Sequence, residues 1–108
     1  MPVTILCRVD DIPEGEARGF YLEQGALFAV KKDGAIFVYR NSCPHLGTQL
    51  EWQENQFLDY DGELIQCASH GALFVIESGE CVAGPCAGDH LQAVEFDIRD
   101  GDIVARNV

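Results

Sequence analysis

Two short segments of the sequence each place a thiol and an imidazole close together. They are residues 43–47, which read CPHLG, and residues 67–71, which read CASHG. A glycine follows each histidine directly or after one residue, and glycine lets the backbone turn tightly around a bound ion or sulfide. One such cysteine or histidine would most simply be structural, but two matching pairs in one small chain favour a metal site. We therefore expect metal ligation by Cys43, His45, Cys67 and His70.

Two kinds of metal group use two cysteines and two histidines. A structural zinc ion usually takes them as a pair of cysteines and a pair of histidines at characteristic spacings. Here each segment supplies one of each. That division suits two irons bridged by sulfide, with both thiolates on one iron and both imidazoles on the other. A zinc-stabilised interaction module remains the alternative from another class.

The charge and the cysteine count restrict the partners and the compartment. Eighteen acidic and seven basic side chains give a formal net charge of -11. Such a field repels nucleic acid and anionic membranes and favours a basic protein partner. No signal-like N-terminus and no apolar run long enough to span a membrane is present, so we expect a cytoplasmic protein. Five cysteines, an odd number, then favour metal binding over a disulfide framework.

Strand-like segments joined by turns must position the four donors. The 108 residues suit a single domain, residues 1–108, and no stretch of ten or more residues has a helical period. Asp33-Gly34 and Asp100-Gly101 each predict a two-residue hairpin turn. We also expect a turn at 10–15, at most one helical turn near 47–52, and the second ligand segment at the tip of a hairpin. The expected strands cover residues 3–9, 17–23, 27–32, 36–40, 63–67, 73–77, 91–99 and 102–106.

The order of the donors resembles a known signature. Cys43-x-His45 followed by Cys67-x-x-His70 is similar to the motif of the Rieske 2Fe-2S proteins. Glycines beside both histidines match that motif, and Gly84-Pro85 resembles the proline loop that covers the cluster in the family. The resemblance spans nearly the whole chain.

This resemblance implies a fold, a cofactor and a set of site residues. The fold is all-β, a small antiparallel β sandwich or barrel with an inserted cluster-binding subdomain at about residues 41–86. The cofactor is one 2Fe-2S cluster per chain, with Cys43 and Cys67 on one iron and His45 and His70 on the other. The residues implied to shield the cluster are Leu46, Gly47, Gly71 and Pro85.

Departures from the high-potential members of the family bear on the redox potential. Those proteins carry a further cysteine in each cluster loop, joined as a disulfide, where this sequence has Thr48 and Ser69. Ala72 and Phe74 stand at positions that in those proteins supply hydroxyl groups near the cluster. Because hydrogen bonds to the cluster sulfurs raise the potential, we expect a value on the order of -150 mV.

The function that the resemblance implies is electron transfer. It is that of a soluble Rieske-type ferredoxin, passing single electrons from a flavin reductase to a terminal oxygenase or similar acceptor. Such a protein is a component of an oxidoreductase system and not an enzyme by itself. The small subunit of a nitrite reductase-like enzyme shares the fold and is a close alternative, but the presence of all four ligands favours electron transfer. A complete Rieske oxygenase would need a further domain for its mononuclear iron.

The remaining unusual residues have simpler structural interpretations. We expect Cys7 to lie in the core, His90 in a surface loop, and Cys81 and Cys86 to be structural, because their spacing differs from that of thiol oxidoreductases. Aromatic residues between the two motifs should pack the cluster loops onto the barrel; they are Trp52, Phe57 and Tyr60. Nearby carboxylates should form a solvated face; they are Asp59, Asp61, Glu63 and Asp89.

Overall fold

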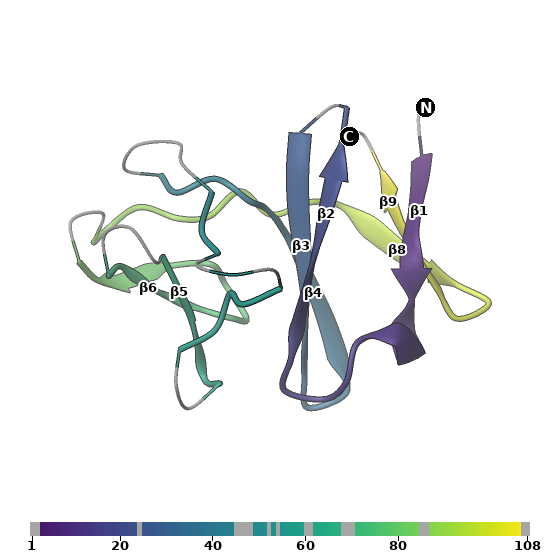
Figure 1. Ribbon diagram of the computed structural model, residues 1–108, viewed down its shortest axis with the longest axis horizontal. Helices are drawn as coiled ribbons and strands as arrows, with labels where there is room; N and C mark the ends of the chain where they lie inside the picture. The colour runs from purple at the N-terminus through teal and green to yellow at the C-terminus, as the bar shows by residue number, and fades with distance from the viewer. Residues whose placement is uncertain are drawn as a thin grey trace.

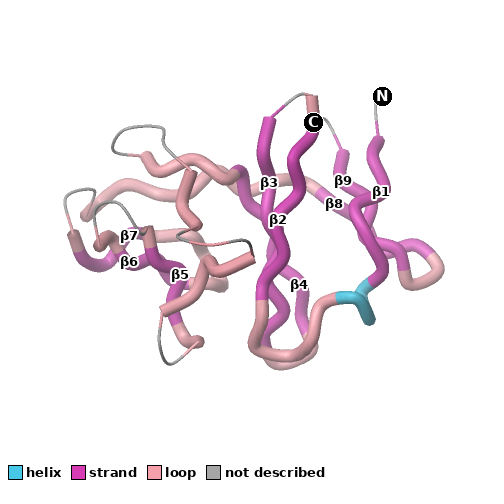
Figure 2. Tube along the Cα trace, viewed as in Figure 1, coloured by secondary structure: helices cyan, strands magenta, loops and turns pink. Residues whose placement is uncertain are grey.

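The regular secondary structure of the described residues consists almost entirely of β-strands, as the computed structural model shows (Figures 1 and 2). The structure describes residues 3–23, 25–44, 49–51, 53, 55–59, 62–67, 71–84 and 87–106. In those ranges the one helical element is a 3-10 turn, η1 (Val9–Asp11), next to the turn expected at 10–15. The strands are β1 (Val3–Arg8), β2 (Ala17–Leu22), β3 (Gly25–Lys32), β4 (Ala35–Arg40), β5 (Leu64–Gln66), β6 (Leu73–Val75), β7 (Cys81–Ala83), β8 (Phe96–Arg99) and β9 (Asp102–Arg106). The predicted all-β class is confirmed.

The strands form three antiparallel sheets of three strands each. Their orders are β1-β9-β8, β2-β3-β4 and β5-β6-β7. Figure 1 shows the sheets following one another along the long axis, with β2-β3-β4 in the middle. Val3 pairs with Arg106, so the first and last strands lie side by side at the end of the molecule opposite β5-β6-β7.

Strand β3 is buried on both faces and joins two hydrophobic cores. Side chains alternate across a strand, so Leu27 and Ala29 point to one side and Phe28 and Val30 to the other. The first pair belongs to a core with β2, β4 and β9, and the second pair to a core with β5 and β6. The apolar run 27–30 is therefore continuous because the middle sheet is covered on both sides.

Two tight hairpins fix the register of the longer strands. The turn residues Asp33 and Gly34 have φ values of 52° and 79°, and Asp100 and Gly101 have 52° and 83°. Both central residues of a type I′ turn need positive φ, which explains the Asp-Gly sequence at each site. Both predicted hairpins are confirmed, β3–β4 by the first and β8–β9 by the second.

The predictions differ from the structure in three places. Strand β7, of three residues, was not predicted; it pairs antiparallel with β6, with an irregularity in register between Leu73 and Phe74. The strand expected at 91–99 begins only at Phe96, because residues 91–94 cross between cores: Leu91 packs in one and Val94 in the other. Residues 49–51 of the helical turn expected near 47–52 are irregular, and residues 47, 48 and 52 lie outside the described ranges.

Candidate metal centre

Cys43 and Cys67 come from separate parts of the chain and enter the same hydrophobic core. Their exposed fractions are 1% and 0%, and both belong to the core beneath β5 and β6. Each follows the end of a strand, Cys43 after β4 and Cys67 after β5. His45 and His70, the other two predicted ligands, lie outside the described residues.

Main-chain hydrogen bonds tie the start of the first ligand segment to the middle sheet. The Asn41 amide donates to the carbonyl oxygen of Ala26 at 2.9 Å, and the Ser42 amide donates to that of Arg40 at 3.0 Å. Cys43 therefore begins its segment directly on the edge of a regular sheet. Leu46 and Gly47, two of the predicted shielding residues, are outside the described ranges.

The second ligand segment closes a short hairpin between β5 and β6. The Cys67 amide donates to the Ala72 carbonyl at 2.9 Å, and the Gly71 amide donates to the Cys67 carbonyl at 2.8 Å. Gly71 has a φ of 69°, in the left-handed region that glycine enters at no cost. The prediction of a hairpin tip at this segment is confirmed, since β5 and β6 pair antiparallel on either side of it.

The chain that leaves β7 approaches the second ligand segment. Gly84 has a φ of 98°, and a Cβ built there would lie 2.7 Å from the Ala72 Cα. Only glycine permits this contact, so the chain leaving β7 lies directly against the residue that follows Gly71. Pro85 and Cys86 come next and are not among the described residues.

The core around the two cysteines is apolar and well packed. Ala72 and Phe74 are both fully buried within it and bring no hydroxyl group. Phe57 stacks on Phe28 with ring centroids 4.5 Å apart and an interplanar angle of 5°. The expected packing role of Phe57 is confirmed, while Trp52 and Tyr60 fall outside the described part.

Tyr39 links the middle sheet to the turn between β6 and β7. Its hydroxyl donates to the Ile76 carbonyl oxygen at 2.6 Å, and a Cβ on Gly79 would lie 2.9 Å from its ring. Burial, and to a lesser extent the negative charge of Glu77, raises the pKa of Tyr39 to about 12. Sequence reasoning missed this residue, because its partner is 37 positions away.

Cys81, Cys7 and the third histidine take structural or surface positions, while Cys86 lies outside the described residues. Cys81 is buried, and its Sγ lies 3.2 Å from the Ala83 carbonyl oxygen. Cys7 is half-buried against the barrel core, and this burial raises the pKa of its thiol. His90 is exposed, as predicted. Within the described ranges, no group of three or more His, Cys, Asp and Glu side chains is placed to hold a metal ion.

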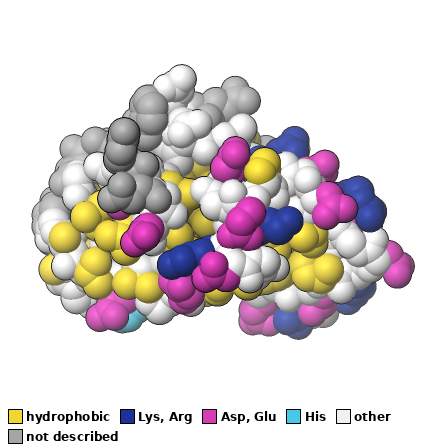
Figure 3. All heavy atoms as spheres, turned by 90° about the horizontal axis from the view of Figure 1, so that it is seen from below, with side chains coloured by type: hydrophobic (Ala, Val, Ile, Leu, Met, Phe, Trp, Pro, Cys, Tyr) yellow, Lys and Arg dark blue, Asp and Glu magenta, His cyan; other side chains and the backbone are white. Residues whose placement is uncertain are grey.

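Charge divides unevenly between the two ends of the molecule. Between Arg40 and Arg99 the sequence contains no lysine or arginine. Residues 41–90 carry eight carboxylates: Glu51, Glu54, Asp59, Asp61, Glu63, Glu77, Glu80 and Asp89. On the face drawn in Figure 3, lysine and arginine side chains gather toward the barrel and none lies at the β5–β7 end.

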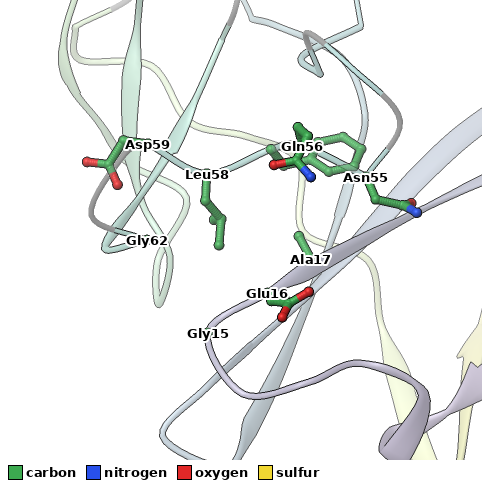
Figure 4. Close-up of a pocket in the computed structure, with 9 residues that line it drawn as sticks. Gly15, Glu16, Ala17, Asn55, Gln56, Leu58, Asp59 and Gly62 are labelled. Atoms are coloured by element: carbon green, nitrogen blue, oxygen red, sulfur yellow. The ribbon is translucent and has the colours of Figure 1, made fainter.

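A polar groove of about 390 Å³ lies between β2 and the segment that precedes β5 (Figure 4). Gly15, Glu16 and Ala17 line one wall, and residues 55–59 line the other. The Gly19 amide donates to the Asn55 side chain at 2.8 Å beside this groove. None of its lining residues is a predicted ligand, so the groove is separate from the candidate metal centre.

No helix in the described ranges is long and apolar enough to cross a membrane.

Comparison with known proteins gives consistent matches over nearly the whole chain. Residues 3–105 match the family model of the Rieske [2Fe-2S] domain. The biphenyl dioxygenase ferredoxin subunit of Pseudomonas sp. strain KKS102 is 27% identical over 101 residues, covering 93% of this chain and 89% of that protein. The ferredoxin component of the alkene monooxygenase system of Xanthobacter autotrophicus is 33% identical over 101 residues, covering 92% and 76%. The solved Sphingomonas yanoikuyae B1 ferredoxin has a TM-score of 0.77 at 30% identity, covering 96% of this chain and 97% of that one.

Proposed function

Because this chain belongs to the Rieske [2Fe-2S] domain family, we propose that it is a ferredoxin that carries single electrons from a flavin reductase to an oxygenase or similar acceptor. The observation that carries the proposal is the burial of Cys43 and Cys67 in one core, each at the end of a different strand. The matched relatives are named as ferredoxin components of oxygenase systems. In this role the chain transfers electrons and performs no catalysis of its own.

The site residues divide into two pairs. We assign Cys43 and Cys67 to one iron, because their buried positions favour a sulfide-bridged core shielded from water. We assign His45 and His70 to the other iron, as the family motif implies. When bound, the cluster supplies a group that gains and loses one electron. Leu46, Gly47, Gly71 and Pro85 are the residues proposed to cover it.

The whole chain, residues 1–108, would act as one domain, with residues of about 41–86 as the cluster-binding subdomain. This segment contains Cys43 and Cys67 and seven of the eight carboxylates, and the eighth, Asp89, follows closely. Because it has no basic side chain, it would attract a positively charged docking surface on the reductase or the oxygenase. Electrostatic steering of this kind weakens as the ionic strength rises. We propose the cytoplasm as the location, where such partners would be found.

The potential should lie at the low end of the family range, at about -150 mV. Ala72 and Phe74 are buried beside the cysteines and offer no hydroxyl hydrogen bond to sulfur. Fewer donors leave the added electron less stabilised. A midpoint above about +100 mV would contradict this part of the proposal.

The cofactor is tested on anaerobically purified protein by iron and sulfide analysis, visible absorbance and electron paramagnetic resonance after dithionite. We expect a red-brown protein with a rhombic signal in the reduced state. Cys43→Ala and Cys67→Ala should each abolish the colour, whereas Cys7→Ser, at a half-buried cysteine outside this core, should keep it. Colourless protein that contains zinc and no sulfide would overturn the proposal.

The ligand set is tested by His70→Cys and by electron transfer. If both imidazoles bind iron, replacing one by a thiolate should lower the midpoint potential, and an unchanged spectrum would remove His70 from the ligand set. The carrier role predicts that the reduced protein passes its electron to an oxidised terminal oxygenase of the relatives' class. The rate should fall as salt is added.

A further inference from the structure

Asn41 is buried, with an exposed fraction of 4%, and no other amide or charged side chain among the described residues is. Its Oδ1 accepts a hydrogen bond from the Leu50 amide at 2.7 Å. Its Nδ2 lies 2.9 Å and 3.0 Å from the two carboxylate oxygens of Glu51. Both halves of the amide are thus used, and they contact two consecutive residues.

Glu51 has a second donor on the neighbouring strand. The Tyr21 hydroxyl, on β2, donates to its Oε2. Tyr21 is 57% exposed, so its hydroxyl makes this contact at the protein surface, while the Asn41 side chain is buried. The carboxylate is therefore held by an amide from the end of β4 and a hydroxyl from β2.

These contacts join the two ends of the segment that carries the first ligand pair. Asn41 precedes residues 42–49, which include Cys43 and His45, and its side chain captures Leu50 and Glu51 immediately after them. The main chain of Asn41 is itself fixed, because its amide donates to Ala26 on β3. A loop whose ends are pinned in advance loses less conformational freedom when its ligands bind.

We propose that Asn41 and Glu51 are positioning residues, which hold the two ends of the first ligand segment together and so slow the loss of the iron that its cysteine and histidine would bind. Asparagine is required because the site needs an acceptor for the Leu50 amide and a donor for the Glu51 carboxylate on one side chain. Aspartate has the same shape but lacks the donor. The inference rests on the proposed ligand role of Cys43 and His45.

The test exchanges the donor and the acceptor between the two residues. Asn41→Asp keeps the acceptor for Leu50 but sets two carboxylates against each other. Glu51→Gln in the same chain restores a donor opposite Asp, with its amide oxygen still available to Tyr21. In the purified iron-sulfur protein we measure iron release to a chelator through the visible absorbance, and the electron paramagnetic signal of the reduced state.

We expect Asn41→Asp to release iron at least about tenfold faster and to broaden the signal. The double variant should return within about threefold of the wild-type rate, because the two changes are coupled and not additive. Glu51→Ala should also release iron faster than the wild type. Because Glu51 is partly exposed, this variant keeps the test decisive if Asn41→Asp does not fold. Asn55→Asp is the matched control: the contact that Asn55 makes with β2 uses its side-chain oxygen, which aspartate keeps, so this variant should release iron at the wild-type rate.

The outcomes separate this inference from the proposed function. A wild-type protein that binds no iron and no sulfide overturns the proposed function. A wild type that binds the cluster, with Asn41→Asp and Glu51→Ala releasing iron at its rate, overturns only the positioning role. Rapid release by Asn41→Asp without recovery in the double variant also overturns it, since loss of packing alone would give that result.

Discussion

Two halves of the molecule are stabilised in different ways. The barrel half consists of β1–β4, β8 and β9, and the cluster half consists of β5–β7 and the loops that contain Cys43 and Cys67. The barrel strands β1–β4, β8 and β9 are four to eight residues long and form extended hydrogen-bonded ladders, with one irregularity between Ile5 and Cys7. Strands β5, β6 and β7 have three residues each, and their surroundings are mostly loops. Individual side-chain contacts supplement these short ladders: the hydrogen bond between the Asn41 side chain and the Leu50 amide, the Tyr39 hydroxyl hydrogen bond, and the stacked ring of Phe57. We therefore expect a single side-chain substitution to perturb the cluster half more than the barrel half.

Neighbouring residues of β3 provide the strongest test of this difference. Phe28→Ala removes the ring that stacks on Phe57 and contacts Tyr39, and it should lower the free energy of unfolding by about 3–5 kcal/mol. Leu27→Ala, on the opposite face, should cost about 2–5 kcal/mol through the barrel core. Urea unfolding measures both costs, and iron release measures the cluster. Only Phe28→Ala should accelerate iron release; equal acceleration by both variants would contradict the division into two halves.

Two glycines with nearly the same backbone conformation separate local strain from contact with the second ligand segment. Gly84 and Gly88 have φ values of 98° and 97°, but only the Gly84 position is crowded, by Ala72. Gly88→Ala should cost about 1 kcal/mol from its positive φ. Gly84→Ala should cost about 1–3 kcal/mol more and shift the visible spectrum, because it displaces the segment beside Ala72. Similar urea midpoints for the two variants would show that the contact at Gly84 is unimportant.

The hydroxyl of Tyr39 tests a single hydrogen bond between the halves. Tyr39→Phe leaves the buried Ile76 carbonyl without its donor and should lower the free energy of unfolding by about 1–2 kcal/mol. The folded-state pKa of about 12 lies above the ordinary value of 10.0, so the folded protein retains this proton more strongly. The contribution of the protonated Tyr39 hydroxyl to the free energy of unfolding is therefore complete below pH 10 and is lost as the pH rises toward 12. Wild-type stability should thus fall over that range by more than that of Tyr39→Phe; parallel pH curves would contradict this linkage.

An exposed ion pair between the halves should have the smallest effect. Lys32 Nζ lies 3.0 Å from Glu77 Oε2, joining the β3–β4 hairpin to the turn that follows β6, and both side chains remain in contact with solvent. Exposed pairs of this kind contribute little to stability. Lys32→Met should leave the urea midpoint and the iron release rate nearly unchanged at high salt. A large loss of cluster in this variant would mean that surface charge, and not buried contacts, holds the halves together.

Much of the barrel could be predicted from the sequence, and less of the cluster half. The Asp-Gly turns and the limits of β9 were predicted correctly, because a turn that needs positive φ and a short apolar run directly after it are local features. Strand β7 was missed, since three residues carry too little pattern to distinguish a strand from a loop. The strand expected from residue 91 was too long, because Leu91 and Val94 look alike in sequence but pack in different cores.

The candidate site also has features that could be predicted from the sequence and features that could not. The chemical types of its donors and their spacing are written in the chain, and they were sufficient to predict the family and the cofactor. The contacts of Asn41 and Tyr39 were not predictable, because Asn41 acts through the Leu50 amide and Tyr39 through the Ile76 carbonyl, which only folding brings to them.

By itself, the sequence determined which atoms can bind metal, where the backbone must turn, and the sign of the charge around the ligand segments. Each of these depends on one residue or its immediate neighbours. The tertiary structure decided that Cys43 and Cys67 share one core, that β3 serves two cores at once, and that Asn41 closes the first ligand segment. Such meetings depend on the simultaneous packing of distant segments, and a local pattern does not encode them.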